Sequence, residues 1–103
     1  MWWRHRPFRA AVAGDSMEPV LRDGDFVVAL RRADPVPGDV VVVHLPGRGR
    51  EGVKRVARIT PAGYWVAGDN PVASTDSRTF GPVPFDAVAG VVRLRYWPRP
   101  RLL

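Results

Sequence analysis

Two side chains in this sequence, the hydroxyl of Ser16 and the amine of Lys54, could together activate a nucleophile. Ser16 lies in the stretch GDSMEP, residues 14–19, and Lys54 is the only lysine of a chain that otherwise uses arginine. An arginine stays charged in proteins, whereas a lysine amine moved out of water loses its proton more readily and can then act as a base. A neutral amine within hydrogen-bond reach of a serine hydroxyl activates that hydroxyl.

Each of these two residues also has a simpler interpretation. Lys54 could be a solvated residue on a strand, and Ser16 could cap a short helical turn over MEPVL. From these residues alone both interpretations stay open.

The composition favours one small, turn-rich domain without a metal centre. The chain has 103 residues, of which 46% are hydrophobic and 25% charged, with 11 prolines and 10 glycines. The absence of cysteine excludes disulfides and a thiol nucleophile. His5 and His44 have no spacing to further ligands that would suggest a metal site. We therefore expect neither a metal nor another cofactor.

The net charge of +6 is compatible with binding nucleic acid, an anionic membrane or an acidic partner. The arginines are spread along the chain, which favours a solvated surface instead. No apolar run approaches the about 20 residues of a membrane-spanning helix, and the start lacks the apolar stretch of about 7 residues of a signal peptide. We expect a cytoplasmic protein, with peripheral membrane contact through Trp2, Trp3 and Phe8 as an alternative.

Short, valine-rich runs between Gly, Pro and Asp predict a mainly antiparallel β fold, either a barrel or a sandwich. The four consecutive valines after Asp39 predict a strand covered on both faces. Helical turns are expected only at 16–21 and near 84–88, and the long connection 69–86 is expected to carry function. The predicted strands are 25–30, 39–45, 52–59, 63–68 and 87–96.

Four stretches of the sequence resemble, in the same order, the successive motifs of the signal peptidase I family of Ser-Lys proteases. They are GDSMEPVL (14–21), PGDVVVVH (37–44), VKRVARI (53–59) and GDNPVASTDSRTFGPVP (68–84). The resemblance implies a compact catalytic domain over 14–98, preceded by a basic aromatic leader at 1–13 and followed by a short basic tail at 99–103.

The resemblance also implies roles for individual residues. Ser16 would be the nucleophile, Lys54 its general base, and Ser74 would orient the amine. Supporting residues would be Asp15, Met17 and Pro19 in the nucleophile turn, Asp69 and Asn70 in a second turn, and an ion pair of Asp76 with Arg78. Some members carry a hydroxyl two residues before the nucleophile for the oxyanion hole. This chain has Gly14 there, so the Ser16 N–H is expected to serve.

Within the family, the chain looks most similar to the small maturation proteases of nickel-type superoxide dismutases. That similarity implies a serine endopeptidase that removes an N-terminal propeptide from a nickel-type superoxide dismutase precursor. Three alternatives remain: a signal peptidase-like protease with another substrate, a self-cleaving protease of the repressor type, and a non-catalytic basic β module. The module would bind nucleic acid or anionic lipid.

Overall fold

The computed structural model describes residues 6–31, 34–47, 49 and 51–103, and it consists mainly of β-strands. Among these residues the short helices lie between β5 and β6: α1 (Ser77–Phe80) and 3-10 turns at Pro71–Ala73 and Phe85–Ala87. The strands are β1 (Pro7–Ala11), β2 (Phe26–Arg31), β3 (Val40–His44), β4 (Glu51–Thr60), β5 (Gly63–Ala67), β6 (Val88–Trp97) and β7 (Arg101–Leu102).

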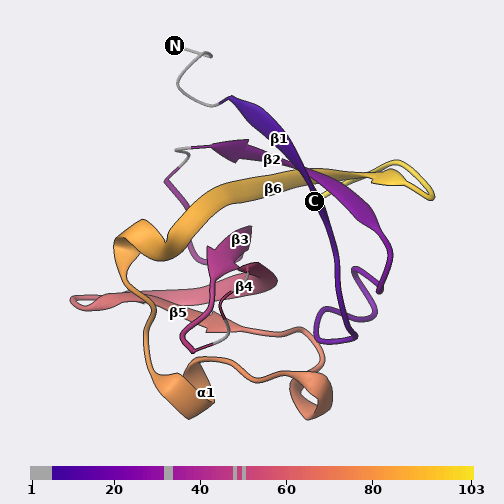
Figure 1. Cartoon of the computed structure of the whole chain (residues 1–103). Coiled ribbons are helices and arrows are strands. Elements are labelled where there is room, and N and C mark those ends of the chain that lie inside the picture. The colour runs from indigo at the N-terminus through magenta and orange to yellow at the C-terminus, as the bar shows by residue number, and fades with distance from the viewer. Residues whose placement is uncertain (1–5, 32–33, 48, 50) are drawn as a thin grey trace.

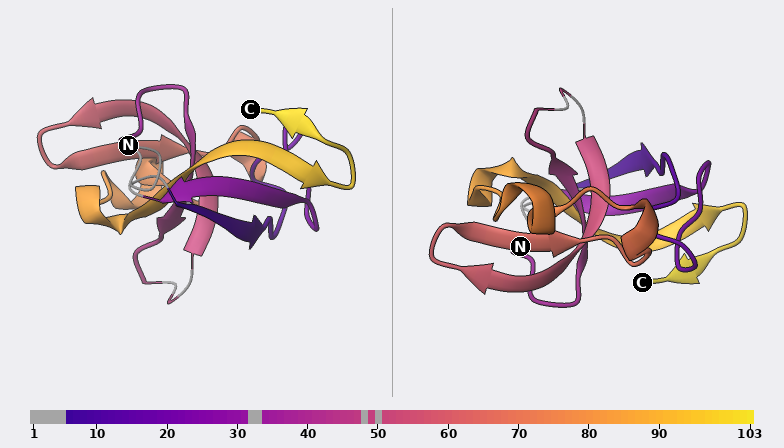
Figure 2. Two further views of the ribbon diagram at one scale, coloured as in Figure 1. Left: turned by 90° about the horizontal axis from the view of Figure 1, so that it is seen from above. Right: turned by 90° about the horizontal axis from the view of Figure 1, so that it is seen from below.

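The strands form one antiparallel sheet in the order β1-β2-β6-β3-β4-β5, with β7 paired to β6. Figure 1 shows β1, β2 and β6 above and β4 and β5 below, with β3 between them. The described strand pairs do not join β1 to β5, so the sheet is folded over without closing into a barrel. In Figure 2 the β4–β5 hairpin projects at one side and the β6–β7 hairpin at the other. The predicted antiparallel β fold is confirmed.

The five predicted strands each overlap one of β2 to β6, and β1 and β7 were not predicted. The leader expected at 1–13 therefore contains a strand of the sheet, and so does the tail expected at 99–103. The turn expected at 84–88 is present at Phe85–Ala87, whereas the segment after Ser16 forms turns without a helix.

Strand β3 separates two hydrophobic cores, which explains its uninterrupted run of valines. Val40 and Val42 pack into the first core with Met17 and Leu21, whereas Val41 and Val43 pack into the second. All four valines are buried because alternate side chains of a strand point to opposite faces. The expectation of a strand covered on both faces is confirmed.

Alternate side chains of β1 pack against the first core. Phe8 and Ala10 pack against this core, and the Arg31 guanidinium lies 4.4 Å from the centre of the Phe8 ring. The predicted membrane contact of Trp2 and Trp3 lies outside the described residues, and that of Phe8 stays a prediction. In the described part of the chain, no helix has the length and apolar character needed to span a membrane.

Candidate active site

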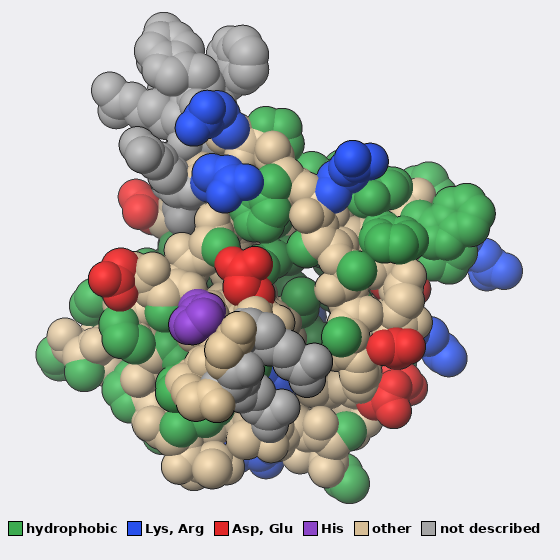
Figure 3. Space-filling view, viewed as in Figure 1, with side chains coloured by type: hydrophobic (Ala, Val, Ile, Leu, Met, Phe, Trp, Pro, Cys, Tyr) green, Lys and Arg blue, Asp and Glu red, His purple; other side chains and the backbone are tan. Residues whose placement is uncertain are grey.

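Ser16 and Lys54 line the same cavity, although they come from a turn after β1 and from β4. The cavity has a volume of about 170 Å³, and its wall also includes Ala11, Ala13 and Val53. Figure 3 shows a hollow near the centre of this face, bordered by acidic and hydrophobic side chains. The sheet thus brings the two residues expected to do chemistry to one concave site.

The nucleophile turn is anchored on both sides of Ser16. Met17, directly after it, is 1% exposed and packs into the first core. The Asn70 backbone N–H donates to the Ser16 carbonyl oxygen at 2.8 Å, and the Asn70 side-chain amide donates to the Asp15 carbonyl oxygen at 3.2 Å. The Gly14 N–H donates to Asp23 Oδ1 at 2.8 Å. These contacts fix the backbone around Ser16, which lines the cavity.

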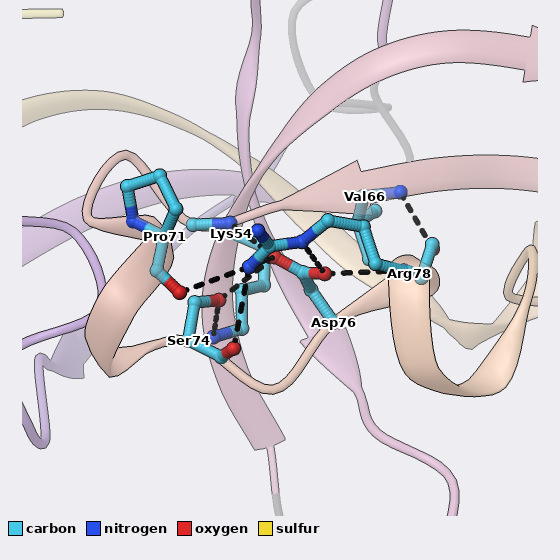
Figure 4. Close-up of polar contacts among 8 residues, drawn as sticks. Lys54, Val66, Pro71, Ser74, Asp76 and Arg78 are labelled. Atoms are coloured by element: carbon cyan, nitrogen blue, oxygen red, sulfur yellow. Dashed lines mark hydrogen bonds and ion pairs between the residues drawn. The ribbon is translucent and has the colours of Figure 1, made fainter.

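Lys54 is 5% exposed, an unusually low value for a lysine. Its Nζ donates to Ser74 Oγ at 3.0 Å, and the Ser74 hydroxyl donates to Asp76 Oδ2 at 2.9 Å. Figure 4 shows this relay from β4 to the loop that follows β5. The amine is therefore oriented by a hydroxyl that is itself oriented by a carboxylate.

Asp76 is the most heavily hydrogen-bonded carboxylate of this region. It is 1% exposed and accepts from the Gly68 N–H at 3.0 Å, and from Arg78 Nε at 2.9 Å and Nη2 at 3.2 Å. Burial acts to raise the pKa of Asp76, but the bonds from Arg78, Gly68 and Ser74 outweigh it and lower this pKa from 3.8 to about 2. Asp76 is thus a fixed negative charge at neutral pH.

Gly68 allows the turn that carries Ser16 and the segment that carries Ser74 to approach one another. A Cβ at this position would lie 2.6 Å from the Ser16 carbonyl oxygen and would also collide with the Ser74 hydroxyl. Both neighbours are parts of the site, so neither can move away without displacing Ser16 or Ser74. Only glycine fits this position, because any Cβ would meet these atoms while the Gly68 N–H is held by Asp76 Oδ2.

Arg55 points away from its neighbour Lys54 and is neutralised by an ion pair. Its Nε and Nη2 donate to the two carboxylate oxygens of Asp69 at 2.8 and 2.7 Å, and its Nη1 donates to the Gly38 carbonyl oxygen at 2.7 Å. This bidentate bond raises the pKa of Arg55. Since Asp69 precedes Asn70, the pair ties β4 to the turn that holds Ser16.

The structure brings most of the predicted site residues together. Asp15 lines the cavity, Pro19 is exposed after a cis peptide bond, and Gly14 has a φ of +81°, which favours glycine. His44, in contrast, is exposed at the end of β3 and does not line the cavity. In the described part of the chain, no group of three or more His, Asp or Glu is placed to hold a metal ion.

Three residues with structural roles at the site were not singled out from the sequence: Asp23, Arg55 and Gly68. Gly68 opens the GDN stretch and could have been noticed there, because a glycine between a strand and a turn often marks close approach. The partners of Asp23 and Arg55 are distant in sequence, and nothing local predicts them.

This arrangement can generate a serine nucleophile if the Lys54 amine is neutral. A buried amine favours its neutral form, and Ser74 would hold it in a fixed direction. Such an amine can accept the proton of a hydroxyl in the same cavity as that hydroxyl attacks a carbonyl carbon.

Comparisons with known proteins identify the chain as similar to peptidases. A family model described as Peptidase S24-like matches residues 4–85. The chain is 42% identical over 66 residues to the "Mitochondrial ATP-independent inner membrane protease subunit 1a" of Arabidopsis thaliana. This alignment covers 64% of this chain and 32% of that protein.

Two further relatives carry similar names. The "Mitochondrial inner membrane protease subunit 1" of Xenopus tropicalis is 31% identical over 84% of this chain and 66% of its own length. The "Signal peptidase I" of Bacillus caldolyticus is 44% identical over 47% of this chain and 26% of its own. In these alignments the chain spans between about a quarter and two thirds of the length of each curated relative.

Proposed function

This chain belongs to the Peptidase S24-like family, and from that premise we propose that it is a serine endopeptidase with Ser16 as nucleophile and Lys54 as general base. The observation that carries the proposal is the shared cavity of the two side chains, together with the bond from Lys54 Nζ to Ser74 Oγ. The names of the relatives, inner membrane protease and signal peptidase, support the same chemistry.

In the proposed reaction, the neutral Lys54 amine takes the hydroxyl proton of Ser16 while Oγ attacks the scissile carbonyl carbon. The Ser16 N–H would stabilise the developing oxyanion, with Gly14 and Asp15 shaping the turn that presents it. The protonated amine then gives the proton to the leaving amine, and an acyl-enzyme remains. Water, deprotonated by Lys54, releases the acyl group and restores Ser16.

The substrate is proposed to bind as an added strand between β1 and β4. One set of backbone groups of β1 and its flanks points toward β2. Hydrogen bonds show this for Arg6 and Val12, and alternation along the strand gives the same direction for Phe8 and Ala10. The N–H and C=O groups of Arg9 and Ala11 therefore point to the open edge of β1. Strand pairing at this edge is a common mode of peptide recognition.

The other side of the groove offers a second open edge. Strand β5 pairs with β4 only from Arg55 onward. The Val56 N–H donates to the Asp39 carbonyl oxygen on the β3 side, so by alternation Val53 and Glu51 direct their backbone groups away from β3. A substrate strand would thus meet backbone partners on both sides.

The strand order of the sheet allows one substrate strand to pair with β1 and β4 in the same sense. Four successive antiparallel pairings lead from β1 through β2, β6 and β3 to β4, so β1 and β4 run in the same direction, toward Ser16 and Lys54. The residues before the scissile bond would occupy the groove, running parallel to both strands. A small residue directly before the scissile bond would suit the alanine-lined wall of the cavity that contains Ser16 and Lys54.

For the natural substrate we propose the precursor of a nickel-type superoxide dismutase, from which an N-terminal propeptide is removed. The support is the resemblance noted from the sequence, whereas the relatives found by comparison are named as inner membrane proteases and signal peptidases. A cytoplasmic location stays a prediction beside it.

The test is to incubate the purified protein with a propeptide-bearing precursor and to read the new N-terminus by mass spectrometry. A signal-type peptide and the Ser16→Ala variant serve as controls. Cleavage of both substrates by the wild type alone is expected. If only the signal-type peptide is cut, the dismutase assignment is wrong; if neither is cut, the endopeptidase itself is rejected.

A further inference from the structure

A second cavity, of about 270 Å³, continues from the first along the groove between β1 and β4. Ala11, Glu51, Gly52 and Val53 line both cavities, so the two form one path. Part of the wall of the second cavity is apolar. This part is built from Phe8, Ala10, Val42 and Val53, which all pack in or against the first core. This cavity has no part in the reaction proposed above.

Two charged residues line the second cavity, and strand geometry gives them different orientations. Glu51 is two residues before Val53 on β4, so both side chains lie on the face turned toward the first core. Arg9 lies between Phe8 and Ala10, whose side chains pack against that core, so Arg9 points to the opposite face of β1. No ion pair joins Arg9 and Glu51 among the described residues. Among the described residues that line this cavity, the Glu51 carboxylate is therefore the charge on the inner wall.

We propose that the second cavity binds a lysine or arginine side chain of the substrate, and that Glu51 determines this specificity. The inference rests on the proposed function, because it takes the groove to hold the residues before the scissile bond. Glu51 precedes Lys54 by three positions on a strand parallel to the bound substrate, and each strand residue advances by about 3.3 Å. The basic residue would therefore stand about three positions before the bond.

A basic side chain matches both parts of this cavity. Its methylene stem can cover the apolar wall while its charged end reaches the carboxylate of Glu51. An acidic side chain would place its charge against apolar atoms and beside a like charge. An apolar side chain would fill the wall but would cover Glu51 without giving it a partner.

The experiment uses the whole chain and a peptide library randomised at the five positions before the scissile bond of a cleaved peptide. Mass spectrometry of the products gives the relative kcat/KM for each residue at each position. For the wild type we expect lysine and arginine to be favoured over glutamate by about two- to fivefold at one of the second to fourth positions, at low salt. Glu51→Gln should weaken this preference, and Glu51→Lys should reverse it there.

Asp86→Lys is the matched control, because it makes the same charge change on an exposed residue that lines neither cavity. It should leave the profile as in the wild type. Cleavage with no preference for basic residues at these positions, or with a preference that Glu51→Lys does not change, overturns this inference alone. A library that is not cut at all overturns the proposed function instead.

Discussion

The Asn70 backbone N–H lies 2.8 Å from the Ser16 carbonyl oxygen and holds the nucleophile turn against the turn that follows β5. The Asn70 side chain adds a second bond, to the Asp15 carbonyl oxygen. Asp69, one residue earlier, is fixed to Arg55 on β4. Through these bonds the position of Ser16 depends on the strand that carries Lys54, and several predictions about positioning can be derived from them.

Asn70→Ala removes the bond to Asp15 and keeps the backbone bond to Ser16. Since the side chain is partly exposed and one neutral hydrogen bond is lost, we expect kcat to fall by about two- to tenfold. The melting temperature should change little, and KM should be unaffected. Steady-state kinetics on a cleaved peptide measures both parameters. A purely structural role would instead lower the melting temperature and leave kcat per folded molecule unchanged.

Gly68→Ala should inactivate the enzyme, because the added methyl group would collide with the Ser16 carbonyl oxygen and with Ser74. Gly63→Ala is the matched control. There, at the start of β5, a Cβ would collide with the Val83 carbonyl oxygen, and neither residue lines the cavities. Both variants should lose stability in thermal unfolding, but only Gly68→Ala should lose activity per folded molecule. Equal activity of the two folded variants would contradict the role given to Gly68.

Asp76→Asn should destabilise the protein in a pH-dependent way. The pKa of Asp76 is lowered from 3.8 to about 2, so its carboxylate stabilises the fold fully above the unfolded pKa, and this contribution is lost as the pH falls through about 2. The shift corresponds to roughly 2 kcal/mol of unfolding free energy at neutral pH.

Urea unfolding at several pH values tests this prediction. The difference in unfolding free energy between wild type and Asp76→Asn should be largest near neutral pH and should shrink between about pH 4 and pH 2. The exposed Asp86→Asn serves as the control and should show no such trend. A difference that stays constant down to pH 2 would show that Asp76 does not stabilise the fold through its charge.

The sequence predicted the strands whose signal is local and missed those that depend on distant partners. The valine runs of β3 and of the middle of β6 are buried on both faces of the strand. The sequence indicates this because apolar side chains follow one another there without alternating with polar ones. Strand β1, PFRAA, is short and contains a proline and an arginine. It is a strand because it pairs with β2 and because Phe8 reaches the first core, and neither contact can be read from five residues.

The same limit applies to the site. Ser16 and Lys54 were singled out by their chemistry and by their resemblance to the motifs of a known family, and Ser74 and Asp76 by that resemblance alone. The bonds of Arg55 to Asp69 and of Gly14 to Asp23 join residues 14 and 9 positions apart, and they depend on the path of the loops that connect the strands. The groove between two open strand edges could not be predicted either, because it requires the strand order of the whole sheet.

Lys54→Met tests whether the buried amine of Lys54 lowers the stability of the fold. The thioether cannot accept a proton, so cleavage should be lost. Burying an amine costs free energy that an apolar side chain of similar length does not, so the variant should be no less stable than the wild type. Thermal unfolding of both proteins at neutral pH measures this. A marked loss of stability would mean that the polar contacts of Lys54 support the fold.

The rate of peptide cleavage by Lys54→Arg tests the central claim most directly. Arginine keeps the positive charge and most of the volume of lysine, but its guanidinium cannot accept the proton of Ser16. We predict that cleavage falls to the level of Ser16→Ala, with a circular dichroism spectrum like that of the wild type. Substantial cleavage by Lys54→Arg, with Ser16→Ala inactive, would contradict the account, because a group other than Lys54 would then be the base.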